Sequence, residues 1–171
     1  SLYKDVATDQ SYEKSWMARA ASNVYYEDGY AYYMYDSTDL FDRVNNSSMN
    51  QNQKSAEYKI VRHKLTTDDK QNGDSDYETL INFTDKENSE AKDTFVSVLK
   101  DGKMEKNELL TKLYAQFVDE QSIYPSIGLT AALYNGKIYF NVSNDIVAYN
   151  PADGSVAVVK EYNEVSAVRD N

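Results

Sequence analysis

Two groups of side chains in this sequence have the type and spacing to do chemistry, and the first is a run of tyrosines. Residues 23–37 contain six of them. Tyrosine rings stack on sugars and anchor protein interfaces, and each adds a hydroxyl for a partner. Successive strand residues point to opposite faces, so Tyr33 and Tyr35 share one face while Tyr30 and Tyr32 share the other. The candidate ligand-binding residues are Tyr26, Tyr30, Tyr32, Tyr33 and Tyr35. The alternative is a strand that the rest of the fold covers on both faces.

The second group is a cluster of acids around Asn72 and Gly73. Clustered carboxylates beside a flexible glycine can wrap Ca²⁺, although such a run also serves as a solvated loop. The candidate metal ligands are Asp69, Asp74, Asp76 and Glu78. Residues 101–108 share the acid, the glycine and the last glutamate of an EF-hand loop, but Leu99 offers no oxygen at a ligand position. We interpret them as a turn into a helix, and expect no cofactor other than this candidate calcium.

Recognisable catalytic motifs are absent from the sequence. The single histidine, His63, has no G-x-S-x-G serine to pair with, and the six glycines form no phosphate-binding loop. With no cysteine, the chain has no disulfide, thiolate nucleophile or zinc–thiolate site. A pair of catalytic carboxylates, as in glycosidases, remains an alternative, because the 28 acidic residues supply many pairs and the sequence does not give the distance between them.

The charge balance narrows the class of partner. A net charge of −10 repels phosphate backbones and anionic lipid, so we expect no nucleic acid and no membrane insertion. No run reaches the ~18 apolar residues of a membrane span. Extracellular proteins of Gram-positive bacteria often avoid cysteine, and the chain starts at Ser1 without methionine. We therefore expect an extracellular or cell-surface protein whose targeting segment has been removed.

The elements that position these residues are predicted mostly as strands. Asp28-Gly29 between two aromatic runs predicts a hairpin, and residues 56–65 and 78–83 have the pattern of half-buried strands. Leucine and aromatic residues at helical spacing predict a helix over 106–120, whereas 91–100 fits a helix or a strand. Asn135-Gly136 and a turn ending at Gly154 predict an antiparallel meander in the last third. The remaining predicted features are a helix or a strap around Trp16, a loop over 42–55 and a turn at Asn144.

The fold class follows from this order of elements. We expect a single domain over 1–171 that is mainly β, an antiparallel meander with a helical insertion over 88–120. The alternative is an α+β single domain.

The units 23–83 and 129–171 look alike, each with a glycine turn, an aromatic strand and a closing strand. This pattern resembles the blades of bacterial β-propellers, of the TolB-like and pyrroloquinoline-quinone-type repeats and of Firmicutes surface propellers. The matching residues are Gly136, Ile138, Tyr139, Phe140, Ile146, Ala148, Tyr149, Asn150, Pro151, Asp153 and Gly154. The motif implies a fold and carries over no quinone-binding or catalytic residue. Because two units cannot close a ring of about four to eight blades, an unclosed β domain or a propeller fragment is implied.

Three hypotheses of function follow. The first is a non-enzymatic binding or scaffolding module of the extracellular space or cell envelope of a Gram-positive bacterium, with a protein or a carbohydrate as partner. The second is a carbohydrate-active enzyme or its accessory domain. The third is a fragment of a larger β-propeller, whose partner is the rest of a longer chain.

Overall fold

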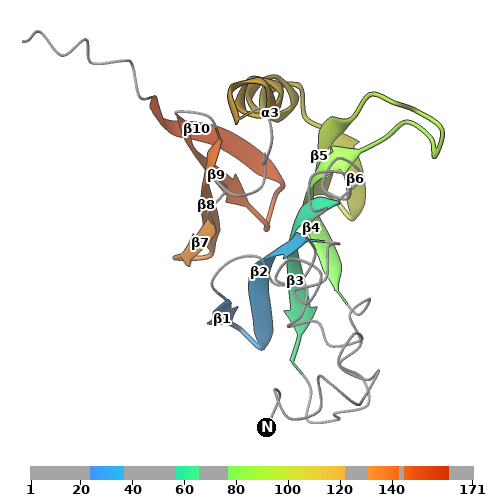
Figure 1. Ribbon diagram of the computed structural model, residues 1–171. Coiled ribbons are helices and arrows are strands. Elements are labelled where there is room, and N and C mark those ends of the chain that lie inside the picture. The colour runs from blue at the N-terminus through green and yellow to red at the C-terminus, as the bar shows by residue number, and fades with distance from the viewer. Residues whose placement is uncertain (1–23, 37–56, 66–76, 122–130, 143–144, 162–171) are drawn as a thin grey trace, which may run out of the picture.

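The computed structural model describes residues 24–36, 57–65, 77–121, 131–142 and 145–161, which form two antiparallel sheets and one helix (Figure 1). The larger sheet has six strands in the order in which the chain makes them. They are β1 (Tyr25–Glu27), β2 (Tyr30–Asp36), β3 (Tyr58–Lys64), β4 (Glu78–Asp85), β5 (Phe95–Lys100) and β6 (Lys103–Lys106).

The smaller sheet follows helix α3 (Glu108–Gln121) and has the order β10-β9-β8-β7. Its strands are β7 (Ala131–Tyr134), β8 (Lys137–Val142), β9 (Asp145–Asn150) and β10 (Ser155–Glu161). The prediction of a mainly β fold with a helical insertion is confirmed. In the described part of the chain, no helix is long and apolar enough to cross a membrane.

Three of the hairpins turn on an acid or amide followed by glycine. Asp28-Gly29, Asp101-Gly102 and Asn135-Gly136 all have positive φ at both residues, 49° and 79° in the first pair. That is the backbone of a type I′ turn, whose twist matches the twist of the flanking strands. The hairpins predicted at Asp28-Gly29 and Asn135-Gly136 are therefore present.

The segment predicted as a helical insertion, 88–120, contains two strands before its helix. Residues 95–106 form the β5–β6 hairpin, which adds two strands to the larger sheet next to β4. Within this segment only Glu108–Gln121 is helical. Residues 101–108 hold a hairpin turn, a strand and the helix start, where we expected a turn leading directly into the helix. The physical reason is that the apolar run 95–99 pairs with β4, and this pairing decides between two elements that its composition allows equally.

The helix starts where Asn107 caps it. The Asn107 Oδ1 atom accepts the backbone N–H of Leu110 at 2.9 Å, which satisfies one of the donors left free in a first helical turn. Leu110, Leu113 and Tyr114 are buried, as their spacing predicts. Leu109 is 42% exposed and lies off this apolar face.

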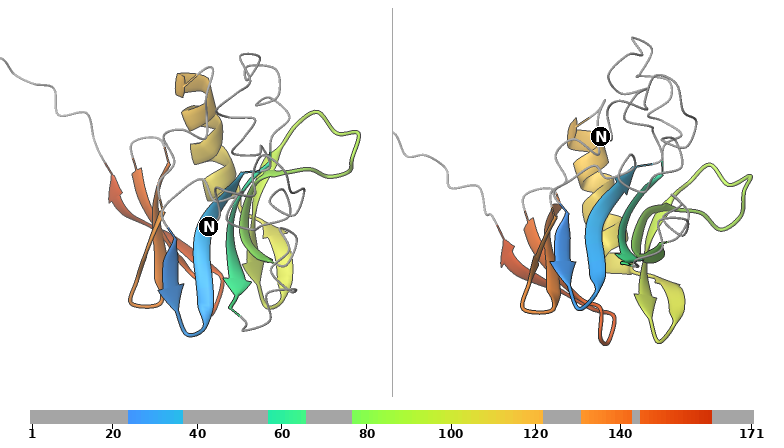
Figure 2. Two further views of the ribbon diagram at one scale, coloured as in Figure 1. Left: turned by 60° about the horizontal axis from the view of Figure 1, so that its bottom comes forward. Right: turned by 90° about the horizontal axis from the view of Figure 1, so that it is seen from below.

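One hydrophobic core joins both sheets and the helix. It contains Met34 and Ile60 of the larger sheet, Leu110 of α3, and Phe140 and Tyr149 of the smaller sheet. We call the sides of the two sheets that carry this core their inner faces. Figure 2 shows the sheets side by side with α3 beyond one end of their strands.

The core is tied together at two points between the sheets. The Phe83 ring of β4 lies 5.7 Å from that of Phe140 in β8 and 5.3 Å from that of Tyr114 in α3, measured between centroids. The buried hydroxyl of Tyr149 donates a hydrogen bond of 2.7 Å to the carbonyl oxygen of Leu99. This bond links the smaller sheet to the β5–β6 hairpin.

Some predicted features lie outside the described residues. They are the helix or strap around Trp16, the loop over 42–55, most of the acidic cluster and the turn at Asn144.

Candidate functional site

The predicted tyrosines lie on both faces of the larger sheet, as strand alternation requires. Tyr32 belongs to the inner core and Tyr30 packs against it. Tyr33 and Tyr35 belong to a second apolar cluster on the outer face. Tyr32 and Tyr33 are 9% and 2% exposed, whereas Tyr26 on β1 is 60% exposed. Of the five, only Tyr26 therefore presents most of its ring to solvent.

The second predicted group, the acids, is described only at Glu78. Asp69, Asp74 and Asp76 lie outside the described residues. Glu78, at the start of β4, forms an ion pair with Arg62 of β3. Within the described ranges no three histidine or acidic side chains gather as metal ligands would.

Arg62 gathers several of the predicted residues at one end of the inner faces. Its guanidinium lies over the Tyr30 ring, 4.8 Å from the centroid, while its Nε donates to Glu78. Burial lowers the pKa of Arg62, but hydrogen bonds to Glu78 and Tyr32 raise it by more, so the net pKa is raised and the cation is permanent. The strand register that sets Arg62 opposite both Tyr32 and Glu78 creates this cluster.

Tyr149 reaches the same region from the smaller sheet. Burial raises its pKa to about 12, and the charges of Arg62, Glu78 and Asp153 also act on it. Hydrogen bonds from Ser155 hold the pKa of Asp153 below its usual value. The hydroxyl of Tyr149 is thus neutral near pH 7 and engaged with Leu99. It has a structural role and offers no acid or base to a ligand.

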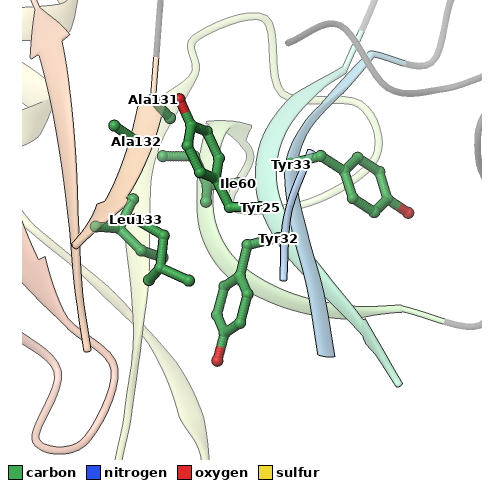
Figure 3. Close-up of a pocket in the computed structure, with 8 residues that line it drawn as sticks. Tyr25, Tyr32, Tyr33, Ile60, Ala131, Ala132 and Leu133 are labelled. Carbon is green, nitrogen blue, oxygen red and sulfur yellow. The ribbon is translucent and has the colours of Figure 1, made fainter. Parts of the chain in front are cut away.

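A small apolar cavity lies between β1–β2 and β7. Figure 3 shows Tyr25 and Leu133 at this gap from the two sheets, with the ring of Tyr33 directed to the other side of β2. The cavity volume is about 10 Å³, which is room for one water molecule. It is too small for a sugar or a nucleotide, and its lining is apolar except for tyrosine hydroxyls.

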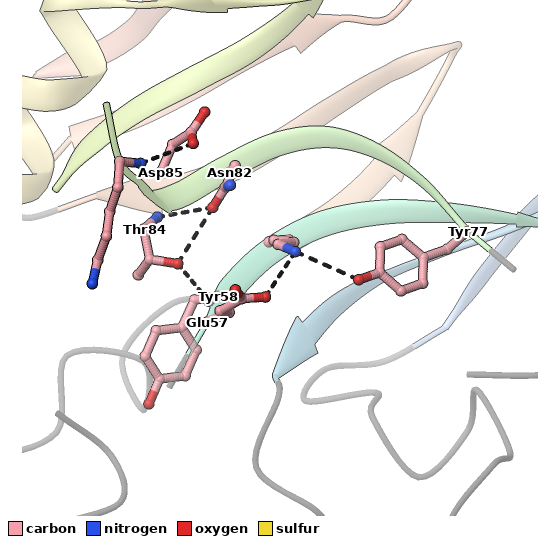
Figure 4. A network of polar contacts seen from close by, with 8 residues as sticks. Glu57, Tyr58, Tyr77, Asn82, Thr84 and Asp85 are labelled. Atoms are coloured by element: carbon pink, nitrogen blue, oxygen red, sulfur yellow. Dashed lines mark hydrogen bonds and ion pairs between the residues drawn. The ribbon is translucent and has the colours of Figure 1, made fainter. Parts of the chain in front are cut away.

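The outer face of the larger sheet holds a cation in an aromatic setting. The ammonium of Lys59 lies 5.5 Å from the Tyr35 ring centroid and 5.7 Å from that of Tyr77, and pairs with Glu57 at 2.9 Å. Figure 4 shows Glu57 and Tyr77 of this network beside the hydrogen bonds from Thr84 to Asn82. Because Lys59 is part of the chain, it takes the position beside Tyr35 and Tyr77 that the cation of a ligand would need.

The same outer face does not assemble a serine-type catalytic group. Ser97 donates to Asp85 at 2.5 Å, an arrangement that would need a histidine to become a triad. Ser97 is level with Lys59 through Asn82 in the strand register. His63 lies four residues further along β3, about 13 Å away along the strand. Catalysis of this type is therefore not supported by the described residues.

A different surface, the outer face of the smaller sheet, is turned away from both the larger sheet and α3 (Figures 1 and 2). Its residues alternate with the core residues of the same strands. By strand register they are Ala132, Tyr134, Lys137, Tyr139, Asn141, Ile146, Ala148, Asn150, Ser155, Ala157 and Lys160. Tyr134 is 73% exposed, and the charged residues of this set are the two lysines, Lys137 and Lys160.

The sequence analysis did not identify this face. Its turns at Asn135-Gly136 and Gly154 predicted the meander, and the residues that point away from the core were not considered as a surface. A signal was present, because Tyr134 and Tyr139 fall on the side of the hairpin opposite Leu133 and Ile138, where charged residues are usual. An outward face without any acid in a chain of net charge −10 is the feature that marks it.

Comparisons with protein-family models, curated proteins and solved structures find no match to this chain. The resemblance to propeller blades therefore stays a prediction from the motif residues alone.

Proposed function

We propose that this chain is a non-enzymatic binding or scaffolding module that engages a protein partner through the outer face of its smaller sheet. The observation that carries the proposal is this face itself. It combines two tyrosines with alanine and isoleucine, and its charged residues by strand register are two lysines, Lys137 and Lys160, with no acid. A protein surface with few charges and exposed tyrosine has the composition of an interface core.

The size of the cavity favours binding over catalysis in the described part of the chain. At about 10 Å³, the cavity between β1–β2 and β7 is too small to enclose a substrate. An open sheet face is suited to a protein partner, because a protein buries its contact area on a broad surface while a small ligand needs concavity. We place the module in the extracellular space or cell envelope of a Gram-positive bacterium, on the grounds of its acidity and lack of cysteine.

The propeller fragment is the second candidate, and one observation favours it. β7 to β10 form a four-stranded antiparallel meander with one face in a core and the other uncovered by any described element. A propeller blade has four such strands and packs its faces on neighbouring blades. In that case the protein partner of the outer face is another blade.

The test is selection of a phage-displayed random peptide library on the immobilised chain. The informative variant is Tyr134→Lys, which places a further cation on the outer face of the smaller sheet. The matched control is Tyr26→Lys, since Tyr26 is also exposed but lies on the larger sheet. We expect the wild type and Tyr26→Lys to enrich the same apolar peptides and Tyr134→Lys to lose them.

Two outcomes would contradict the proposal. Loss of peptides with Tyr26→Lys and not with Tyr134→Lys would move the site to the tyrosine run predicted from sequence. Absence of any peptide, together with binding to a panel of cell-wall glycans, would favour the carbohydrate hypothesis.

A further inference from the structure

The register of the smaller sheet arranges the side chains of its outer face in rows that cross the strands. Successive rows are two residues apart along a strand, which is about 7 Å. The rows are Tyr134 with Lys137, then Ala132 with Tyr139, Ala148 and Ala157, then Asn141 with Ile146 and Lys160. The middle row is therefore uncharged, and one lysine belongs to the row on either side of it.

The charges on this face are both positive in a chain whose net charge is −10. Lys137 is exposed, and it forms no ion pair in the described part of the chain. Hydrogen bonds from Ser155 hold the pKa of Asp153 below its usual value, and the charge of Lys137 adds to this effect. Because Asp153 is already engaged by Ser155, a partner that displaces water from Lys137 has to supply an acid of its own.

The two lysines are separated in both directions of the sheet. Lys160 lies two strands from Lys137, about 10 Å, and about 13 Å further along the strands, so their Cα atoms are about 16 Å apart. In a helix, two residues on the same side span about 16 Å when they are about 11 residues apart, because that number makes three turns. One helix can therefore place an acid over each lysine.

The size of the face also favours a helix. The face is about 14 Å across its four strands and about 13 Å along its three rows. This area of about 200 Å² is well below the ~800 Å² per partner of a standard interface, so a single element of the partner covers it. A helix is about 10–12 Å wide and satisfies its own backbone hydrogen bonds, whereas a lone strand laid on the face would leave its backbone groups unpaired.

We propose that the partner of this face is a short amphipathic helix with an acid at each end of its apolar stripe. The two acids lie over Lys137 and Lys160, and the apolar stripe lies on the middle row. The alanines of that row are small enough for a helix to approach closely, and Tyr139 supplies a ring for it to pack against. This inference rests on the proposed function, because it names the chemistry of the partner of the same face.

The test is selection of a phage library of helical peptides, with random residues on one side of the helix, on the immobilised full chain. Enriched peptides are synthesised with a fluorescent label, and their affinities are measured by fluorescence anisotropy. We expect these peptides to have glutamate or aspartate at two positions about 11 residues apart, with apolar residues between them on the same side.

The informative variant is the double charge reversal Lys137→Glu with Lys160→Glu. We expect it to weaken the enriched peptides by about tenfold or more, because two attractive pairs become repulsive. Replacing the two acids of a peptide by lysines should restore its affinity for this variant, which a misfolded chain could not do. The matched control is Lys64→Glu with Lys103→Glu, which gives the same net charge on exposed positions of the larger sheet and should leave the affinity unchanged.

A further variant, Tyr134→Ala, separates this inference from the proposed function, because it removes an exposed ring of the face without adding charge. Peptides that Tyr134→Ala weakens and the double charge reversal does not would overturn the acidic helix and leave the proposed function standing. An equal loss in the matched control would overturn it too, since the effect would then follow net charge alone. Peptides that Tyr134→Ala leaves unaffected would contradict both proposals.

Discussion

Replacing Gly154 by alanine tests how closely the two sheets approach. Gly154 is buried in the turn between β9 and β10, with φ at +71°. A Cβ atom added there would lie 2.7 Å from the carbonyl oxygen of Leu99 and 2.8 Å from the Cα of Lys100. Both are backbone atoms of the β5–β6 hairpin, which cannot rotate away as a side chain would. The hairpin and the turn must therefore separate.

The cost has two parts, and a second glycine isolates one of them. Positive φ costs alanine about 1–2 kcal/mol relative to glycine. Gly136 has φ at +75° and nothing within 4 Å of its added Cβ, so Gly136→Ala measures this part alone. Separating the backbones adds about 1–3 kcal/mol of overpacking, and weakens the nearby bond from Tyr149 to Leu99. We expect Gly154→Ala to lose about 2–3 kcal/mol more stability than Gly136→Ala.

The assay is urea unfolding followed by far-ultraviolet circular dichroism. With a slope of about 2 kcal/mol per molar urea, the extra loss moves the midpoint of Gly154→Ala about 1–1.5 M below that of Gly136→Ala. Equal midpoints for the two variants would refute the close approach between the β9–β10 turn and the β5–β6 hairpin. The described packing of the sheets would then be incorrect.

Two further predictions concern the same core. Tyr149→Phe should lose about 1 kcal/mol in urea unfolding, because the carbonyl of Leu99 loses its donor. In the wild type the pKa of Tyr149 is about 12 against 10.0 for the free side chain, so its contribution is full below pH 10 and is lost as pH rises towards 12. The stability difference between wild type and variant should shrink over that range, and a constant difference would contradict the assignment. Phe83→Ala should lose about 3–5 kcal/mol, since Phe83 is fully buried between Tyr114 and Phe140, whereas Leu109→Ala should lose less than about 0.5 kcal/mol. A similar loss in both variants, again by urea unfolding, would contradict the position of the core.

Local chemistry explains which elements could be predicted from the sequence. Asp28-Gly29 and Asn135-Gly136 are hairpin turns because few other residues accept positive φ at both positions. Helix α3 is predictable from the spacing of its leucines, and its first residue follows a capping asparagine, Asn107. The alternation of tyrosines in β2 gave the correct partition between the two faces.

The features that could not be predicted depend on contacts between distant segments. The sequence of β5 fits a helix as well as a strand, and its pairing with β4 makes it a strand. Arg62 meets Glu78 and Tyr30 only because of the strand register, with an irregularity between Ile60 and Val61. Nothing local indicates that the face of Tyr33 is buried, because that depends on what the rest of the chain covers.

The most direct test of the proposed function is photo-crosslinking from a single position on each surface. The photoreactive amino acid benzoylphenylalanine replaces Tyr134 in one protein and Tyr26 in another, two tyrosines that are 73% and 60% exposed. Each protein is irradiated with the envelope fraction of Gram-positive cells that express it. We predict an adduct at position 134 that protease digestion removes and glycosidase digestion leaves, with little at position 26. An adduct at position 26 and none at 134, or one at 134 that only glycosidases remove, would contradict a protein-binding face on the smaller sheet.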